Sequence, residues 1–268
     1  MRVSEFLEAF HRELPLGLAM PDDPVGVQVM VEDRELGGVA IAYEMNEQAA
    51  DEAAATGAEL VIAFHPLIYP SVRRLTPESR VERTVMRLVQ RNLTLAIVHT
   101  AFDAHPEGTS TLLARALRLV GIRPLVPNPA LPGAGMGAIG ELPEAQSIEE
   151  FARTLRAACN APAVRVSTDH HADARTIRTV AVIGGSGMSF YDHAVTAGAD
   201  ALVTADVRYH GFHAANDRIP VLDPGHAESE RFVVEGIAAL VARVCRHHGF
   251  DLRTVLLAGP TNPVRFVI

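Results

Sequence analysis

Short apolar runs that stop on a histidine constrain the fold of this chain most strongly. The run at 59–64 is followed by His65 and Pro66, and the run at 93–98 is followed by His99. Short apolar runs separated by amphipathic segments are typical of buried strands in a parallel sheet. Proline disfavours a helical conformation in the preceding residue, so His65 is expected to lie extended at a strand end. Ligands bind at the carboxyl edge of such sheets, which makes both histidines candidate site residues.

Strand and helix patterns alternate over much of the sequence. In the first half, strands are expected at 37–43, 59–64 and 93–98, and helices at 46–57, 77–92 and 108–121. In the second half, helices are expected at 147–159, 187–197 and 226–248, and strands at 163–167, 179–184, 201–206, 219–225 and 254–259. This alternation predicts the α/β fold class.

The segment 123–147 interrupts the alternation. It contains several Pro and Gly, which disfavour regular structure, so we expect an irregular connection into a second unit. We therefore expect two α/β lobes. The first is discontinuous, comprises 1–125 and 221–268, and binds metal, and the second is inserted at 126–220.

Composition excludes several classes of function. The chain has 268 residues and a net charge of −8, which argues against general attraction to nucleic acid. It has no apolar run long enough to cross a bilayer and no signal-peptide pattern, so we expect a cytoplasmic protein with no membrane partner. All 24 basic residues are Arg, which removes Schiff-base catalysis and the Walker-type phosphate loop. Cys159 and Cys245 lie in helical patterns and are expected to be buried rather than disulfide-bonded.

Histidines and carboxylates gather in three segments. His226 and Glu230 are spaced to lie on one face of a helix, and Asp103 follows His99 by four residues. Donors of this kind without thiols are typical of a site for a divalent ion such as Zn, Fe, Mn, Co or Ni. A single histidine at a strand end is more often structural, so the prediction depends on the five candidates together.

Six segments, in order, resemble the motifs of the Nif-three-like family, commonly called GTP cyclohydrolase 1 type 2 homologues. They are Phe64–Tyr69 (FHPLIY), His99–Asp103 (HTAFD), 135–142 (GMGAIGEL), Gly184–Gly187 (GGSG), Thr204–His210 (TADVRYH) and the pattern from Asp223 to Glu230 (DPGHAESE). The resemblance covers roughly residues 25–260.

The resemblance implies a fold of two α/β lobes with mixed sheets and a metal site in the cleft between them. Carried over by position, His65 and Asp103 bind one ion, His226 binds another, and Glu230 bridges both. His99 lies beside them as a ligand or acid/base residue. The resemblance also implies a homo-oligomer, in the form of a hexamer.

The sequence departs from the family pattern at three places. Phe64 stands where the family has a histidine ligand to the second ion, and Ala101 replaces an asparagine. The family's early Trp-Asp-Asn segment is also changed, in PDDPVGVQV at 21–29. The chain is therefore identified as a divergent member with one or two ions, in which His105 or water can fill the position that Phe64 leaves.

The leading hypothesis is a metal-dependent hydrolase acting on an unknown small polar or nucleotide-like substrate, with His99 moving the proton. The alternative is a non-catalytic metal-binding module for regulation or interaction, which Phe64 favours. A third hypothesis is a nucleotide-binding domain that uses Gly184–Gly187 without a metal. Activity on GTP is not carried over, because nothing in the sequence indicates recognition of guanine.

Overall fold

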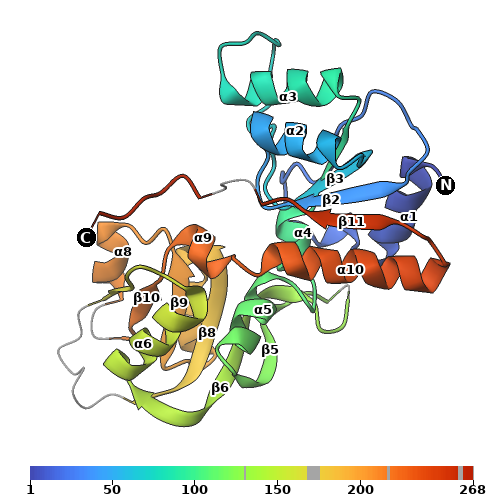
Figure 1. Cartoon of the computed structure of the whole chain (residues 1–268). Helices are drawn as coiled ribbons and strands as arrows, with labels where there is room; N and C mark the ends of the chain where they lie inside the picture. The colour runs from blue at the N-terminus through green and yellow to red at the C-terminus, as the bar shows by residue number, and fades with distance from the viewer. Residues whose placement is uncertain (130, 168–175, 216–217, 259–261, 268) are drawn as a thin grey trace. The chain divides into compact units, whose positions relative to one another are not determined.

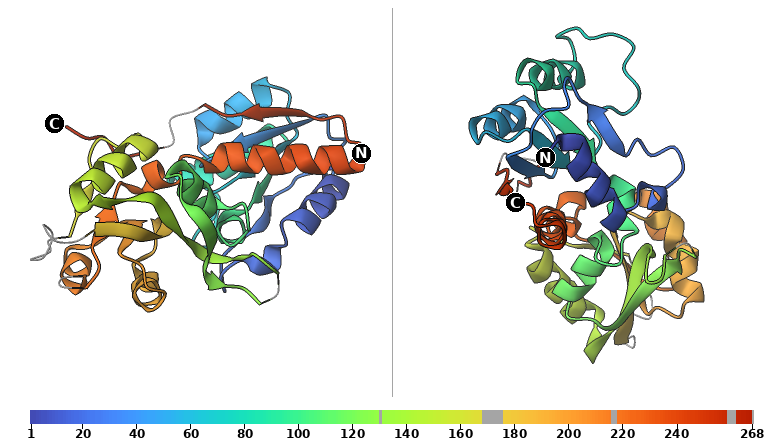
Figure 2. Two further views of the ribbon diagram at one scale, coloured as in Figure 1. Left: turned by 90° about the horizontal axis from the view of Figure 1, so that it is seen from below. Right: turned by 90° about the vertical axis from the view of Figure 1, so that its right-hand side faces the viewer.

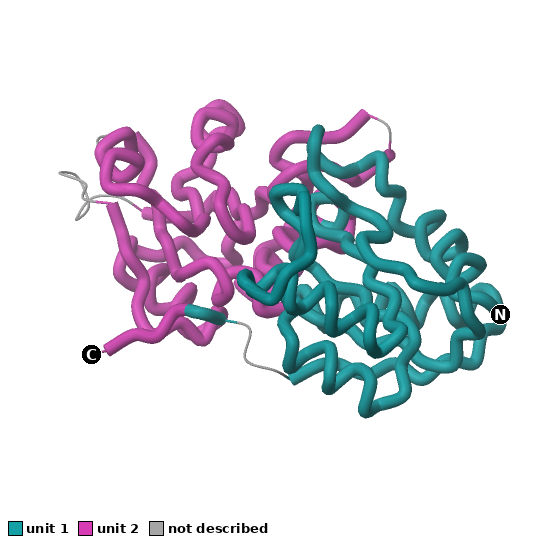
Figure 3. The backbone as a smooth tube through the Cα atoms, turned by 90° about the horizontal axis from the view of Figure 1, so that it is seen from above, with its two compact units in different colours: residues 1–102, 233–263 teal, residues 103–232, 264–268 magenta. Residues whose placement is uncertain are grey.

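The computed structural model describes residues 1–129, 131–167, 176–215, 218–258 and 262–267. The chain forms two compact units (Figure 3). Unit 1 comprises Met1–Phe102 and Val233–Pro263, and unit 2 comprises Asp103–Phe232 and Val264–Ile268. Each unit contains helices and its own mixed sheet, which confirms the expected α/β fold class. Within the described ranges, no helix is long and apolar enough to span a membrane.

The sheet of unit 1 is parallel apart from one edge strand. In spatial order its strands are β1 (Gly26–Val29), β4 (Thr94–Ile97), β3 (Leu60–Ala63), β2 (Gly38–Ala42) and β11 (Arg253–Leu256). Strand β1 runs antiparallel to β4, and the other neighbours are parallel. All residues of β2, β3 and β4 are buried, as their uninterrupted apolar sequence predicts.

Helices cover both faces of this sheet (Figure 1). Alternate residues of β2, β3 and β4 pack against α2 (Glu47–Ala55) and α3 (Arg80–Gln90). On the other face, α10 (Val233–His248) contacts β2 and lies beside α1 (Val3–Glu13), as both views of Figure 2 show. Asn46 and Ser79 cap α2 and α3 by accepting hydrogen bonds from backbone N–H groups of the first turn.

The sheet of unit 2 has three parallel strands at its centre. In spatial order its strands are β5 (Val120–Pro127), β6 (Gly135–Ser147), β8 (Thr176–Ser186), β9 (Ala201–Ala205), β10 (Val221–Asp223) and β7 (Arg165–Val166). Strands β8, β9 and β10 are parallel, and β5, β6 and β7 pair antiparallel to their neighbours.

The two faces of this sheet are also covered. Helices α5 (Thr109–Ala116) and α6 (Ile148–Cys159) pack on one face, and α7 (Tyr191–Thr196) and α8 (Tyr209–Ala214) belong to the opposite face. The short helix α9 (His226–Ser229) follows β10 and contacts β8 and β9. Both cysteines are free, and Cys159 is buried as expected from the sequence, whereas Cys245 is only half-buried.

The irregular connection expected at 123–147 is wrong, because most of this segment forms β5 and β6. Strand β5 lies at the sheet edge, where a proline such as Pro124 removes no essential hydrogen bond. A Cβ atom on Gly135 would clash with the Val126 carbonyl oxygen, so glycine permits the close approach of the two strands.

The single long helix expected at 226–248 is also wrong, because it divides into α9 and α10. Glu230 has φ −105° and ψ 5° and ends α9. The Ser229 hydroxyl donates to the His226 carbonyl oxygen, a local hydrogen bond that competes with helix continuation.

The units are divided at residues 102/103, 232/233 and 263/264, whereas the sequence patterns suggested 125/126 and 220/221. Leu113 and Ala114 of α5 pack in the core of unit 2, and β10 pairs within the unit 2 sheet. Gly259, at the end of the expected last strand, lies outside the described residues.

Candidate functional site

His65 extends strand β3 of unit 1 by two residues. Its backbone N–H donates to the Tyr43 carbonyl oxygen at 3.0 Å, which continues the pairing of β3 with β2. The imidazole lies between aromatic rings, with centroids 4.7 Å from Tyr43 and 4.9 Å from Phe64. The His65 and His99 rings are 5.5 Å apart and nearly perpendicular. The structure therefore brings the two strand-end histidines of unit 1 together.

His99 begins α4 (His99–Asp103) and is fixed by a carboxylate. Its Nδ1 lies 2.8 Å from Asp23 Oδ1, and its backbone has φ +23°, which is uncommon for a residue with a side chain. The Asp23 side chain is only 7 % exposed, and the His99 side chain is 29 % exposed. The pair joins two segments that are 76 residues apart in sequence.

Phe64 is fully buried beside both histidines. Its ring packs near Tyr43, His99 and Phe102, with centroids 5.7 to 6.4 Å away. An aromatic hydrocarbon fills the position where the resemblance implies a metal-binding imidazole. Unit 1 therefore has one fewer nitrogen donor than the family pattern.

In unit 2, a buried aspartate shapes the turn that precedes α9. Asp223 is 2 % exposed and accepts hydrogen bonds from the backbone N–H groups of Gly225 and Val207 at 2.9 and 3.1 Å. Arg165 forms an ion pair with the same carboxylate. Gly225 has φ +103°, a conformation that glycine adopts readily, and it directs the chain into His226.

His226 lies between two carboxylates. Its Nδ1 is 2.7 Å from Asp206 Oδ2, and its Nε2 is 3.1 Å from Glu230 Oε2. Burial lowers the pKa of His226, but the hydrogen bond and charge of Glu230, together with Asp206, outweigh burial and raise this pKa to about 9. Glu230 is 4 % exposed, so its carboxylate is held against the imidazole with little access to water.

Gly185 makes the close placement of these donors possible. It has φ +65°, and a Cβ atom there would clash with Glu230 Oε1 and lie 3.2 Å from His226 Nε2. The Gly185 N–H donates to the Ser229 hydroxyl at 2.9 Å, and Gly184 N–H donates to Ser110. Two N–H groups of the glycine turn are thus used within unit 2, which favours the structural interpretation of this turn over a phosphate cradle.

Asp103 is the first residue of unit 2, and its carboxylate accepts a 2.5 Å hydrogen bond from the Thr109 hydroxyl. Thr109 in turn packs against Gly184, next to Gly185. His105 is 7 % exposed, and its Nδ1 accepts from the backbone N–H of Glu107 at 3.1 Å.

The structure therefore groups the predicted residues within each unit. His65 and His99 are neighbours in unit 1, and His226 and Glu230 are neighbours in unit 2. The sequence did not single out Asp23 or Asp206 as the partners of the two histidines. Asp206 lies in the TADVRYH motif, which is a usable signal, whereas Asp23 lies in a segment that departs from the family pattern.

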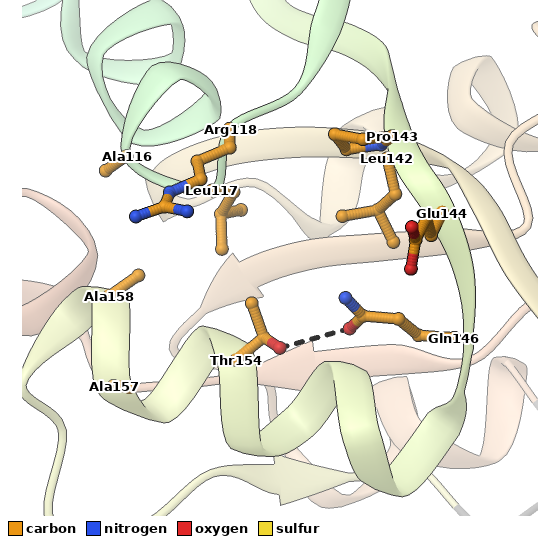
Figure 4. A pocket seen from close by; sticks show the side chains of 10 residues that line it. All are labelled: Ala116, Leu117, Arg118, Leu142, Pro143, Glu144, Gln146, Thr154, Ala157 and Ala158. Carbon is orange, nitrogen blue, oxygen red and sulfur yellow. Dashed lines mark hydrogen bonds between the residues drawn. The ribbon is translucent and has the colours of Figure 1, made fainter.

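Unit 2 also has an open cavity of about 550 Å³ between α5, β6 and α6 (Figure 4). Leu117 and Leu142 contribute apolar lining, and Arg118, Glu144 and Gln146 contribute polar groups. None of the ten residues drawn around this cavity is a predicted site residue. The candidate chemistry is therefore not located in this cavity.

Comparison with known proteins identifies the family. The model of the family described as Duf34/NIF3 (NGG1p interacting factor 3) matches residues 1–263. The chain belongs to the Duf34/NIF3 family. A Duf34/NIF3 relative from Streptomyces coelicolor, named GTP cyclohydrolase 1 type 2 homolog, is 36 % identical over 98 % of this chain and 93 % of its own length. A Lactococcus lactis protein of the same name is 28 % identical over 98 % of both chains.

Solved structures share the Duf34/NIF3 fold. The Bacillus cereus protein related to NIF3 superposes with a TM-score of 0.90 at 21 % identity, covering 100 % of this chain and 99 % of that chain. A Staphylococcus aureus hypothetical protein gives the same TM-score and coverage at 23 % identity. The family model and the Streptomyces coelicolor relative confirm the family that the sequence motifs predicted, and these structures confirm the fold.

Proposed function

We propose that this Duf34/NIF3 protein is a divalent-metal-dependent hydrolase acting on a small polar or nucleotide-like substrate. The observation that carries the proposal is the arrangement of His226 between Asp206 and Glu230. Metal-binding histidines usually donate their second ring N–H to a carboxylate, which orients the ring and raises its basicity. Asp206 fits this role on Nδ1, and Nε2 is left for an ion shared with Glu230.

The donor set fits a divalent ion. In the proposal, His65, His226 and Glu230 supply two nitrogens and a carboxylate, and Asp103, carried over from the family resemblance, completes the set. These donors suit Zn, Fe, Mn, Co or Ni, and thiolates are not involved. The absence of a side chain at Gly185 leaves room beside both unit 2 donors.

The chain's own residues would share the work of hydrolysis. A divalent ion, when bound, polarises a carbonyl or phosphoryl oxygen and lowers the pKa of a bound water. His99 would accept and return the proton, since imidazole is the side chain most often used in general acid–base catalysis. Asp103 is fixed by Thr109 and Glu230 by its burial, so these carboxylates need little reorganisation to act as ligands.

Metal analysis of gently purified protein tests the proposal. We expect about one divalent ion per chain, and His226→Ala and His65→Ala should each remove it while the fold is retained by circular dichroism. His193→Ala is the matched control, because His193 is exposed on α7 and should retain the metal. Protein without a bound divalent ion, or equal metal content in all three variants, would contradict the proposal.

A second candidate is a non-catalytic metal-binding module of the same family. The buried Phe64 favours it, because a lost donor can remove turnover while a metal-stabilised fold remains. A panel of phosphoesters, nucleotides and amides separates the two candidates, since only the hydrolase turns over a member of the panel. Phe64→His sharpens the test: it should raise the metal content towards two ions per chain, whereas Phe64→Leu should not.

The proposal includes a homo-oligomeric state, a hexamer by resemblance to the family. Sedimentation velocity of the full chain tests it directly. A single species near six times the mass of one 28.8 kDa chain is expected, and a monomer at micromolar concentration would remove this part of the proposal.

A further inference from the structure

Asp23 is a buried acidic residue in unit 1 whose role the proposed hydrolysis does not yet include. Its Oδ1 lies 2.8 Å from His99 Nδ1. Its Oδ2 accepts from the Thr100 backbone N–H at 3.1 Å and also from the Thr100 hydroxyl. With 7 % of the side chain exposed, protein groups rather than water satisfy this carboxylate.

The Thr100 hydroxyl donates its proton to Asp23 Oδ2. Its oxygen accepts a 2.9 Å hydrogen bond from the backbone N–H of Met20, so its own hydrogen is available for Asp23 Oδ2. Both groups that face Oδ2 are therefore donors. The carboxylate is anchored on that side and cannot rotate without losing two hydrogen bonds.

The segment that carries Asp23 is fixed independently of His99. The Asp23 N–H donates to the Met20 carbonyl oxygen, and the Val25 N–H donates to the Asp23 carbonyl oxygen. Gln28, further along the segment, accepts from the backbone N–H groups of Leu67 and Ile68 just beyond His65. The aspartate is thus presented to His99 by a folded segment.

We infer that Asp23 is a positioning residue that holds His99 in the tautomer with its proton on Nδ1. An ionised carboxylate accepts hydrogen bonds and cannot donate, so the ring nitrogen that faces it must carry the hydrogen. Nε2 is then the nitrogen with a lone pair, available to take a proton or to bind an ion. This inference rests on the proposed function, because it specifies how His99 performs the role given to it there.

Asp23→Asn provides a test with almost no change in shape. The asparagine oxygen should take the place of Oδ2, because Thr100 presents two donors there, and the NH₂ group should then face His99 Nδ1. An NH₂ group donates, so the imidazole must accept at Nδ1 and carry its hydrogen on Nε2. The same inversion explains the loss of catalysis when the aspartate of a serine-protease triad is replaced by asparagine.

The measurement is ¹⁵N–¹H correlation NMR of the histidine side chains in the metal-free full-length protein at alkaline pH. A His99→Gln sample assigns the His99 signals. We expect the Nδ1–H tautomer in the wild type and the Nε2–H tautomer in Asp23→Asn. Asp22→Asn, a change at the exposed neighbouring residue, should leave the wild-type pattern.

An Nε2–H tautomer in the wild type would overturn the inference, and so would an unchanged tautomer in a folded Asp23→Asn protein. The wild-type spectrum tests the inference about the His99 tautomer even if Asp23→Asn does not fold. Because these spectra are recorded without metal, they are independent of the metal analysis that tests the proposed function. Loss of metal binding with the expected tautomer would contradict only the hydrolase proposal.

Discussion

Each unit of the molecule contains an aspartate that holds Nδ1 of a histidine, but the two pairs are built differently. In unit 1, Asp23 is 7 % exposed and is fixed by Thr100. In unit 2, the Asp206 side chain is 56 % exposed, and its Oδ2 lies 2.7 Å from His226 Nδ1. The first pair joins residues 76 apart in sequence, and the second joins residues 20 apart.

The comparison indicates which features of each unit position its aspartate–histidine pair. The unit 1 pair depends on a folded segment that anchors the carboxylate. The unit 2 pair depends on backbone conformation at several positions, because Asp206, Gly185 and Gly225 all have positive φ, whereas in the unit 1 pair His99 does and Asp23 does not. Unit 2 should therefore be sensitive to changes in backbone freedom, and unit 1 to changes in hydrogen bonding.

The largest effect is expected from Gly185→Ala. The left-handed backbone costs about 1–2 kcal/mol for a residue with Cβ, and the clash with Glu230 adds about 1–3 kcal/mol of overpacking. Chemical denaturation should report this loss of stability, and titration calorimetry should report loss of metal affinity because Glu230 is displaced.

Gly198→Ala is the matched control for that change. Gly198 has φ +77°, but a Cβ atom there meets nothing within 4 Å, so only the backbone cost remains. It should lower stability by about 1–2 kcal/mol and leave metal affinity unchanged. Equal effects of both substitutions on metal binding would refute the dependence of the unit 2 donors on Gly185.

The next largest effect is expected on metal affinity when each of the two aspartates is replaced by asparagine. Asp206→Asn should weaken metal binding by about 10–100-fold, the usual cost of losing a carboxylate behind a metal-binding histidine. Asp23→Asn should change metal affinity much less, because its partner His99 is proposed to carry a proton. Competition with a fluorescent chelator measures the dissociation constant of the metal for each variant. A larger loss of affinity in Asp23→Asn than in Asp206→Asn would contradict the comparison.

A smaller effect is expected from pH. The pKa of His226 is raised from 6.5 to about 9 in the folded chain, so protonated His226 stabilises the metal-free protein fully below about pH 6.5. This stabilisation should fall as the pH rises towards about 9. His226→Gln should flatten that part of the unfolding profile, and an unchanged slope would contradict the assignment of the shift to His226.

The same pKa predicts proton release on metal binding. An ion that binds Nε2 must displace the proton of His226, so metal affinity should increase with pH up to about 9. Calorimetry near pH 7.5 in buffers of different ionisation enthalpy should detect the released proton. Metal binding without proton release would mean that the ion does not displace the proton of His226, so His226 would not be a metal ligand.

The smallest effects come from two matched helix caps. Ser79 of α3 in unit 1 and Ser147 of α6 in unit 2 form the same capping box, with Glu82 and Glu150 respectively. The hydrogen bonds from each serine lower the pKa of its glutamate. Ser79→Ala and Ser147→Ala should each cost about 0.5–2 kcal/mol. Hydrogen exchange should show lower protection only in the unit that carries the substitution. An equal loss of protection in both units would contradict this expectation and would indicate that the two units unfold in one cooperative transition.

Much of the fold follows from the pattern of apolar residues in the sequence and from the residues that end each helix or strand. Strands β2, β3 and β4 lie within the predicted ranges, because a fully buried parallel strand has a continuous apolar sequence. Strands β5 and β6 were not predictable in this way, since Pro124 and Gly135 are ordinary loop signals. The position of β5 at the sheet edge makes Pro124 compatible with a strand, and Gly135 fits in β6 because its missing Cβ permits the close approach of β5.

The site was partly predictable for a similar reason. His65 and His99 follow apolar runs, and His226 and Glu230 have one-turn spacing, so their pairing within each unit could be expected. The partnership of Asp23 with His99 could not, because it crosses 76 residues and depends on how the segment at 19–25 folds. The break between α9 and α10 was also hidden, since no Gly or Pro lies between His226 and Glu235 to mark it.

The central proposal is that His226 and Glu230 of unit 2 hold a divalent ion. Crystallography of zinc-loaded protein, with anomalous data on both sides of the zinc absorption edge, tests it most directly. The proposal predicts an anomalous peak within bonding distance of Nε2 of His226 and a Glu230 oxygen. A zinc ion bound elsewhere in fully loaded crystals, with no peak at these two side chains, would contradict it.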